Sequence, residues 1–175
     1  MTWTSFHRRA ETLRRVVATA NSRRDGVLPT DVDGVAETFA DDLDLLGALQ
    51  LAWHTRLGGH LDRRLAEEPL DLPAAVVAAW GAAYRDLPGV RAVLDAGRER
   101  PADDATALAT ARAAVKEHAL LAVTSGLAGL GDDAAAAPIG AALEERARAA
   151  VAAVEERRDV PARSLLGRIR AALAA

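Results

Sequence analysis

Alanine accounts for 42 of the 175 residues, and 26 of these lie in the last 74 positions, whereas all six aromatic side chains lie at or before Tyr84. Alanine is the strongest intrinsic helix former because it loses no side-chain entropy when a helix forms. The chain therefore favours an all-α fold. Its first half carries the bulky side chains of a core, and the helices of its second half are expected to approach one another closely.

Composition restricts the classes of protein further. The length fits one domain, and half of the residues are apolar, as in ordinary globular proteins. The absence of cysteine excludes disulfide scaffolds, thiolate metal sites and cysteine nucleophiles. The N-terminus lacks the apolar stretch of a signal peptide, and the uncharged run over 119–131 is too short to span a bilayer. We expect a soluble, cytoplasmic protein with no membrane span.

Helical periodicity and turn residues predict a single-domain bundle of six to seven helices and no sheet. A first helix is expected over 5–24, and a second over about 30–57 as one long helix or as a short one running into a longer one near Ala40. Gly58 and Gly59 are expected to kink or break it before a continuation to Glu68. Further helices are expected over 72–85, 88–100, 103–130 and 138–158, with breaks near 25–30, 69–73, 101 and 131–137.

The expected domain, 1–175, has three parts. Residues 1–100 form an aromatic-cored part in which Phe39, Trp53 and Trp80 are buried together, and residues 101–160 form an Ala-rich helical hairpin. The run 119–130 has no charge on any side, so we expect a helix buried all round. A break at Pro161 precedes an amphipathic tail, 161–175, which is either frayed or docked, preferably within a homodimer.

The first predicted helix is basic, because residues 1–24 contain six arginines and one glutamate. Its basic face has the charge to bind phosphates of a polyanion, and it comprises Arg8, Arg9, Arg14, Arg15, Arg23 and Arg24. The net charge of the chain is −3 and no DNA-reading motif accompanies this helix. Nucleic acid is therefore an unlikely partner, and we expect these arginines to face solvent or neighbouring carboxylates.

An acidic counterpart follows in the sequence. Glu37, Asp41 and Asp44 have the spacing of one helical face, which could receive the basic helix. An acidic face can also bind hard cations when it is buried. We favour the structural interpretation of these carboxylates.

The histidines give little sign of a metal or a catalytic centre. Only His7 and Glu11 have the spacing of a helical metal site, and arginines surround them. His60 and His118 are expected to be hydrogen-bonded residues at the core or its edge. The glycines of 126–131 do not match a phosphate loop, and Ser125 has no nucleophile context. We predict no cofactor, no metal and no catalytic residue.

These observations predict a non-catalytic interaction or assembly protein whose partner is another protein or a second copy, with a homodimer favoured. One alternative is a regulator or nucleoid-type protein that binds a polyanion through the first helix. Another is an enzyme or small-ligand binder with a pocket near Trp53, His54 and Trp80. The candidate contact residues are Arg8, Arg9, Arg14, Arg15, Trp53, His54 and His60.

Overall fold

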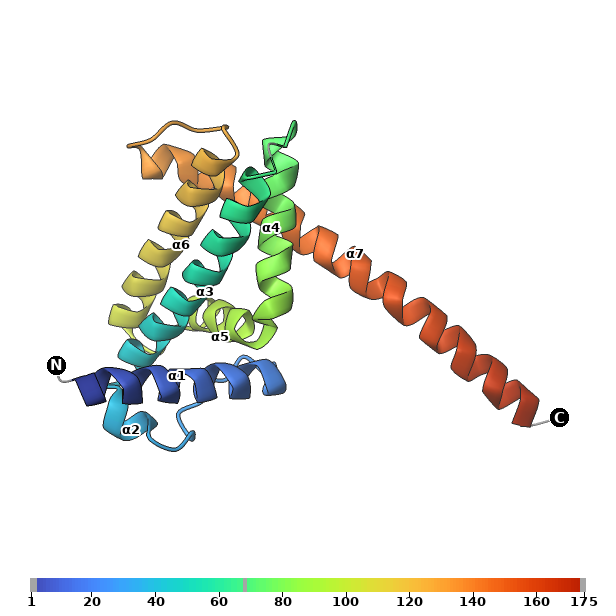
Figure 1. Cartoon of the computed structure of the whole chain (residues 1–175), viewed down its shortest axis with the longest axis horizontal. Helices are drawn as coiled ribbons and strands as arrows, with labels where there is room; N and C mark the ends of the chain where they lie inside the picture. The colour runs from blue at the N-terminus through green and yellow to red at the C-terminus, as the bar shows by residue number, and fades with distance from the viewer. Residues whose placement is uncertain (1–2, 68, 174–175) are drawn as a thin grey trace.

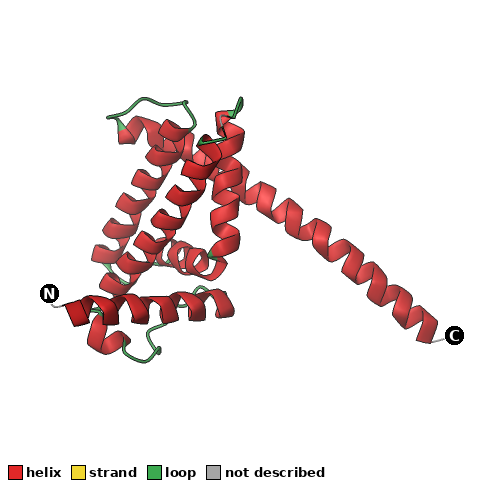
Figure 2. Cartoon of the chain, in the orientation of Figure 1, coloured by secondary structure: helices red, strands yellow, loops and turns green. Residues whose placement is uncertain are grey.

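The computed structural model describes the backbone of residues 3–67 and 69–173 and the side chains of 7–67 and 69–157. Within these residues the chain is all-helical and contains no strand (Figures 1 and 2). The helices are α1 (Trp3–Arg23), α2 (Val35–Thr38), α3 (Asp42–Leu65), α4 (Leu72–Asp86), α5 (Pro88–Glu99), α6 (Asp104–Thr124) and α7 (Asp133–Leu173). The predicted all-α bundle is confirmed.

Aspartates determine where four of the helices begin. Their carboxylates accept backbone N–H groups three residues ahead, at 2.7–3.0 Å, and so satisfy donors that a helix start leaves open. The four capping residues, for α3, α4, α6 and α7, are Asp41, Asp71, Asp103 and Asp132. Pro73 and Pro88 lie in the first turns of α4 and α5, as their positions in the sequence predict.

Around Ala40 the chain forms a short helix followed by a longer one, which is the second of the two expected arrangements. The chain is extended at Phe39 and Asp41, so the short helix α2 ends before α3 begins. The predicted break at Gly58 and Gly59 is wrong, because α3 runs through both. Their neighbours Trp53, Leu57 and Leu61 are buried, and this packing outweighs a helix-propensity cost of about 2 kcal/mol for two glycines.

The loop between α6 and α7 lies earlier than predicted. Gly126 has a positive φ of 72°, and the N–H groups of Gly126 and Leu127 close the end of α6 on the carbonyls of Val123 and Ala122. The expected helix to residue 130, buried on all sides, is therefore wrong, and Leu130 is 90% exposed. The α7 helix begins at Asp133 instead of Pro138, because Asp132 caps it.

The expected break at Pro161 is also absent. Proline removes one backbone donor, and α7 nevertheless remains continuous to Leu173. The side chains of residues 158–175 lie outside the described residues, and with them the predicted docking of the tail.

Two glycines allow helices to approach closely. A Cβ at Gly140 in α7 would overlap the backbone carbonyl of His118 in α6, and a Cβ at Gly89 in α5 would overlap that of Ala20 in α1. The close approach expected for the Ala-rich helices is thus present between α6 and α7. Figure 1 shows α1 crossing one end of α3 and α6, with α7 passing over the other end.

The core is centred on two tryptophans. Trp53 and Trp80 are fully buried, and their rings meet edge to face with centroids 5.5 Å apart. Phe39 is buried in the same cluster, which also receives side chains from α1, α5, α6 and α7. A second, smaller cluster between α6 and α7 is built from alanines: Ala119, Ala122 and Ala136. Across the residues that the structure describes, no helix combines the length and apolarity needed to cross a membrane.

Candidate functional site

A network of charged side chains lies inside the bundle, beside the two tryptophans. Arg91 on α5, Glu117 on α6 and Glu144 on α7 are each only 3–4% exposed. The guanidinium of Arg91 donates to Glu117 Oε1 at 2.7 Å, to Glu144 Oε1 at 2.8 Å and to Asp95 Oδ1 at 3.0 Å. One buried cation thus links α5, α6 and α7.

A second cation completes the network from α7. Arg148 donates to Glu144 Oε1 at 2.6 Å and to Asp95 Oδ1 at 2.8 Å. Its guanidinium lies 5.1 Å from the ring centre of Trp80, and that of Arg91 lies 4.9 Å from the ring centre of Trp53. Both aromatic rings therefore present a face to a cation, an arrangement that is favourable in a desolvated interior.

Polar groups of the tryptophan and histidine side chains surround the same carboxylates. Trp80 Nε1 donates to Glu117 Oε1 at 3.3 Å, and His118 Nε2 lies 2.7 Å from Glu144 Oε2. His54 Nε2 lies 3.8 Å from Glu117 Oε2, too far for a hydrogen bond. His54 Nε2 and Trp53 Nε1 are buried without a hydrogen-bond partner.

The environment alters the acidity of three of these groups. Burial acts to raise the pKa of Glu144, but the hydrogen bond to His118 and the charges of Arg91 and Arg148 outweigh it, so the pKa lies well below its ordinary value. Burial acts to lower the pKa of Arg148, and the bonds to Asp95 and Glu144 raise it above its ordinary value. Burial lowers the pKa of His54, with Glu117 opposing and Arg91 reinforcing the shift.

The buried centre of the network, at Arg91 and Glu117, has almost no free space beside it. The cavity that Arg91 and Glu117 line with Gln50, Leu94, Arg98, Thr110 and Ala114 has a volume of about 10 Å³, near the minimum for one water molecule. A substrate cannot reach Arg91 or Glu117 without opening the bundle, whereas the side chain of Arg148 is about a third exposed. The described residues also contain no group of three or more His, Asp or Glu side chains that could hold a metal ion. The arrangement is suited to fixing how three helices dock.

The structure does not bring Trp53, His54 and Trp80 together around one pocket. Trp53 is completely buried, and His54 contacts the network. Trp80 does line a hollow of about 210 Å³, whose other lining residues are Tyr84, Arg148, Val151, Ala152 and Glu155. Neither Trp53 nor His54 contributes to it.

The candidate residues of the basic helix are divided between partners and solvent. Arg9 forms a two-pronged ion pair with Asp44 at 2.6 and 3.0 Å and lies over Phe39, and Arg15 donates to Thr12. Arg8 and Arg14 have no partner in the described part of the chain. Asp44 thus receives the basic helix as expected, but Glu37 lies in α2 and Asp41 caps α3, so the three carboxylates do not share one helical face.

His60 lies at the edge of the bundle. Its Nε2 is 2.8 Å from Asp86 Oδ2, and Arg63 lies 2.8 Å from its other ring nitrogen. This agrees with the interpretation of His60 as a hydrogen-bonded edge residue. The network itself is not among the predicted sites. Its signal in the sequence is a charged residue among apolar neighbours three and four positions away, as for Glu117 beside Ala113, Ala114 and Leu121.

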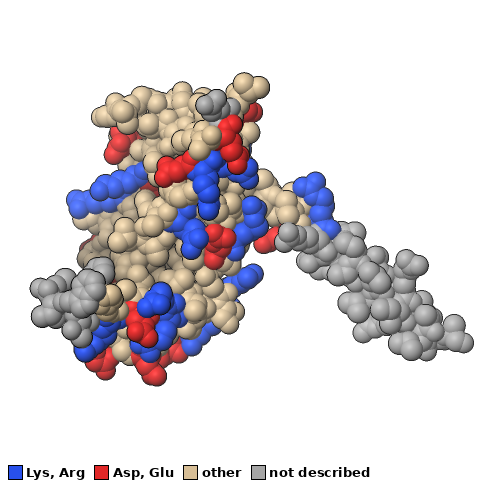
Figure 3. Space-filling model, viewed as in Figure 1, with Lys and Arg blue, Asp and Glu red and all other residues tan. Residues whose placement is uncertain are grey.

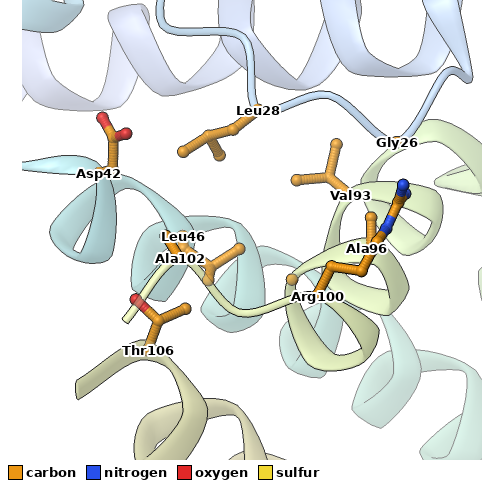
Figure 4. A pocket seen from close by; sticks show the side chains of 10 residues that line it. Gly26, Leu28, Asp42, Leu46, Val93, Ala96, Arg100, Ala102 and Thr106 are labelled. Carbon is orange, nitrogen blue, oxygen red and sulfur yellow. The ribbon is translucent and has the colours of Figure 1, made fainter. Parts of the chain in front are cut away.

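A hollow of about 350 Å³ opens where the loop after α1 meets α3, α5 and the start of α6. Figure 4 shows Asp42 and Arg100 on opposite sides of this hollow, with Leu28, Leu46 and Val93 between them. Its charged groups do not converge on one point, as a catalytic arrangement requires.

Two further hollows flank α3. One, of about 410 Å³, lies against α1 and is lined by Arg9, Ala10, Leu13, Asp44, Gly47, Ala48 and Leu51. The other, of about 180 Å³, lies against α6 and is lined by Leu46, Gly47, Gln50, Ala109, Thr110 and Ala113. Between them Leu51 is 67% exposed. We call the two hollows, together with the exposed α3 residues Gly47 and Leu51 and the exposed Thr55 and Gly59 that follow them beyond the hollows, the α3 face.

No protein-family model, curated protein or solved structure matches this chain.

Proposed function

We propose that this protein is a non-catalytic helical interaction protein that binds a protein partner through the α3 face. The observation that carries the proposal is the exposed Leu51 beside two hollows whose lining is mainly apolar. Contiguous apolar surface of this kind marks interaction sites more often than isolated exposed leucines do. Gly47, Leu51, Thr55 and Gly59 carry no charge, and the exposed Arg56 beside Thr55 is paired with Asp86 on α4.

The interior supports the non-catalytic part of the proposal. The buried acids and bases are paired with one another, and the free space beside Arg91 and Glu117 is about 10 Å³. A catalytic acid or base has to reach its substrate within hydrogen-bond distance. The network instead gives the bundle a rigid frame on which α3 presents its outer face.

Polyanion binding through the first helix has weaker support. Arg9 and Arg23 are engaged in two-pronged ion pairs with Asp44 and Asp31. Phosphate binding would have to compete with these carboxylates, which are held close by the fold. The free arginines Arg8 and Arg14 are too few to form a strong phosphate-binding surface alone.

A photo-crosslinking residue placed at Thr55 in the natural producing cells tests the proposal. We expect a covalent adduct with a discrete protein, and we expect the additional substitution Leu51→Asp to remove it. The same crosslinker at Leu130, an exposed leucine in the loop after α6, is the control. Equal adducts at both positions, or none at Thr55, would show that the α3 face is not a binding surface. An adduct of two copies of this chain would identify the predicted homo-oligomer.

A further inference from the structure

We propose that the hollow of about 350 Å³ between Asp42 and Arg100 binds a small zwitterion, a molecule whose ammonium and carboxylate groups are separated by an apolar chain. Three features of the hollow support this: its walls, its apolar floor and the two charges at its sides. Both charged residues lie outside the α3 face, so this site is additional to the one proposed for a protein partner.

The walls of the hollow are held in place by contacts of their own. The carboxylate of Asp25 accepts a backbone N–H of the turn after α1 at 2.9 Å. A Cβ at Gly26 would lie 3.3 Å from the Cβ of Ala96, so this turn lies directly against α5. Asp103 caps α6 at 2.7 Å. A preformed concave site needs little ordering when a ligand binds, and its volume lies near the lower end of the range of about 300–1,000 Å³ for small-molecule sites.

The floor of the hollow is apolar. Leu46 on α3 and Val93 on α5 are buried, and Leu28 from the loop after α1 lines the same space. Figure 4 shows these three side chains between the two charged ones. The middle of a ligand therefore has to be apolar, because a charged or polar group there would lose water without gaining a partner.

The two charged side chains that line the hollow have opposite signs. Asp42 comes from the start of α3 and Arg100 follows the end of α5, and Figure 4 places them on opposite sides. Neither forms an ion pair with the other or with any side chain in the described part of the protein. Arg98, by contrast, is paired with Asp95 at 3.4 Å. The charges of Asp42 and Arg100 are thus available to a ligand.

Other charges nearby in the sequence do not line the hollow. Asp25 and Asp103 accept backbone N–H groups, and the exposed Glu99 and Asp104 are not among the lining residues. On the face of the molecule that Figure 3 shows, acidic and basic side chains are interspersed, so this face has no broad surface of one sign that would attract a singly charged ligand. Selection of the ligand rests on the two charges inside the hollow.

A zwitterion matches these charges better than an ion of one sign does. Its carboxylate can accept two N–H groups from the guanidinium of Arg100, and its ammonium can donate to Asp42. A singly charged ligand would leave one of the two residues partly desolvated without a partner. Because the two residues lie on opposite sides of the hollow, the charges of the ligand must be separated by a chain, unlike the adjacent charges of an α-amino acid.

Binding of small probes to the full chain tests the proposal. The probes are γ-aminobutyrate, ε-aminocaproate and ω-aminocaprylate, each compared with the carboxylate and the amine of the same chain length. Methyl NMR signals of Leu46 and Val93 report binding in the hollow, and the signals of Leu61, near the other end of α3, are the reference. We expect at least one zwitterion to bind about tenfold or more tightly than either matched ion, because each charged contact contributes to affinity.

Substitution of each charge identifies the group that it binds. Arg100→Gln should weaken the zwitterion by about tenfold or more without weakening the amine. Asp42→Asn should weaken the zwitterion without weakening the carboxylate. The matched controls are Arg112→Gln on α6 and Asp62→Asn on α3, which are exposed positions outside the hollow and should change neither.

Filling the hollow provides an independent arm. Ala102 is exposed and its side chain lines the hollow, so Ala102→Phe should abolish binding while the fold persists. No shift with any of the three zwitterions, or equal affinity for a zwitterion and its two matched ions, would overturn the proposal. Binding that survives both Arg100→Gln and Asp42→Asn would overturn it as well. A crosslink at Thr55 does not depend on these charges, so failure here leaves the α3 face as a protein-binding surface.

Discussion

Arg91 meets carboxylates from three helices with a single side chain. Its bonds reach Asp95 within α5, Glu117 in α6 and Glu144 in α7, and all of these partners are largely or wholly removed from water. Taking charges out of water is costly, and this cost is recovered only while each charge keeps its partners. The residue is therefore more sensitive to removal than an ion pair at the surface.

We predict that Arg91→Met lowers the free energy of unfolding by about 3–5 kcal/mol, because it leaves Glu117 and Glu144 buried beside fewer cations. Arg23→Met is the control, since the pair of Arg23 with Asp31 is exposed to solvent and should contribute far less to stability. Chemical denaturation of both variants measures the difference. Equal losses of stability would mean that the buried network contributes no more to folding than a surface ion pair does.

The network could be predicted only in part from the sequence. The burial of Trp53 and Trp80 follows from their being two of the few large side chains available, and it is confirmed. The pairing of these rings with Arg91 depends on how α3, α4 and α5 cross, and no local pattern encodes that crossing. A charged residue on an apolar stripe indicates burial, but it does not identify the partner.

At the scale of helices, glycines have roles that differ with their surroundings. Gly140 allows the backbones of α6 and α7 to approach, Gly126 ends α6 in a left-handed conformation, and Gly59 lies within α3 facing open space. From the sequence alone, each of these glycines is expected to weaken a helix. Only the surrounding packing determines which of them ends the helix.

We predict opposite effects for two substitutions of glycine by alanine within helices. Gly140→Ala should destabilise the fold by about 1–3 kcal/mol or more, because its Cβ would overlap the carbonyl of His118. Gly59→Ala should stabilise it by up to about 1 kcal/mol, because the helix gains propensity and the Cβ meets no atom within 4 Å. Thermal unfolding compares them, and a gain for both would show that α6 and α7 are not in close contact.

The starts of α4 and α6 were predictable for a physical reason, whereas the start of α7 at Asp133 was missed. An aspartate cap involves a carboxylate and a backbone N–H three residues away, so the sequence contains both partners, as with Asp71 and Ala74. The continuity of α3 through Gly58 and the end of α6 at Gly126 depend instead on a balance between propensity and tertiary packing. The α3 face could not be predicted from the sequence, because the residues that line its hollows come from α1, α3 and α6, which are far apart in the chain.

At the scale of the whole molecule, the network couples folding to pH. In the folded protein the pKa of Glu144 lies below its ordinary value, so the carboxyl binds fewer protons than it does in the unfolded chain. The pKa of His54 is lowered as well, because burial disfavours the imidazolium. For both groups, stability is present above the unfolded pKa and is lost as pH falls below it.

We therefore predict that the free energy of unfolding decreases when pH falls below about 6.5, where His54 takes up a proton in the unfolded chain, and decreases again below about 4.5 through Glu144. Each proton contributes at most about 1.4 kcal/mol per pH unit. Denaturation series between neutral and acidic pH measure how steeply the free energy of unfolding changes with pH.

His54→Gln should flatten this dependence just below pH 6.5, because Glu117 and Arg91, which face His54 from α6 and α5, remain in place. Glu144→Gln should flatten it below about pH 4.5 even though it lowers stability at neutral pH. If His54→Gln leaves the slope near pH 6 unchanged, the buried imidazole is not the group that makes the bundle sensitive to mild acid.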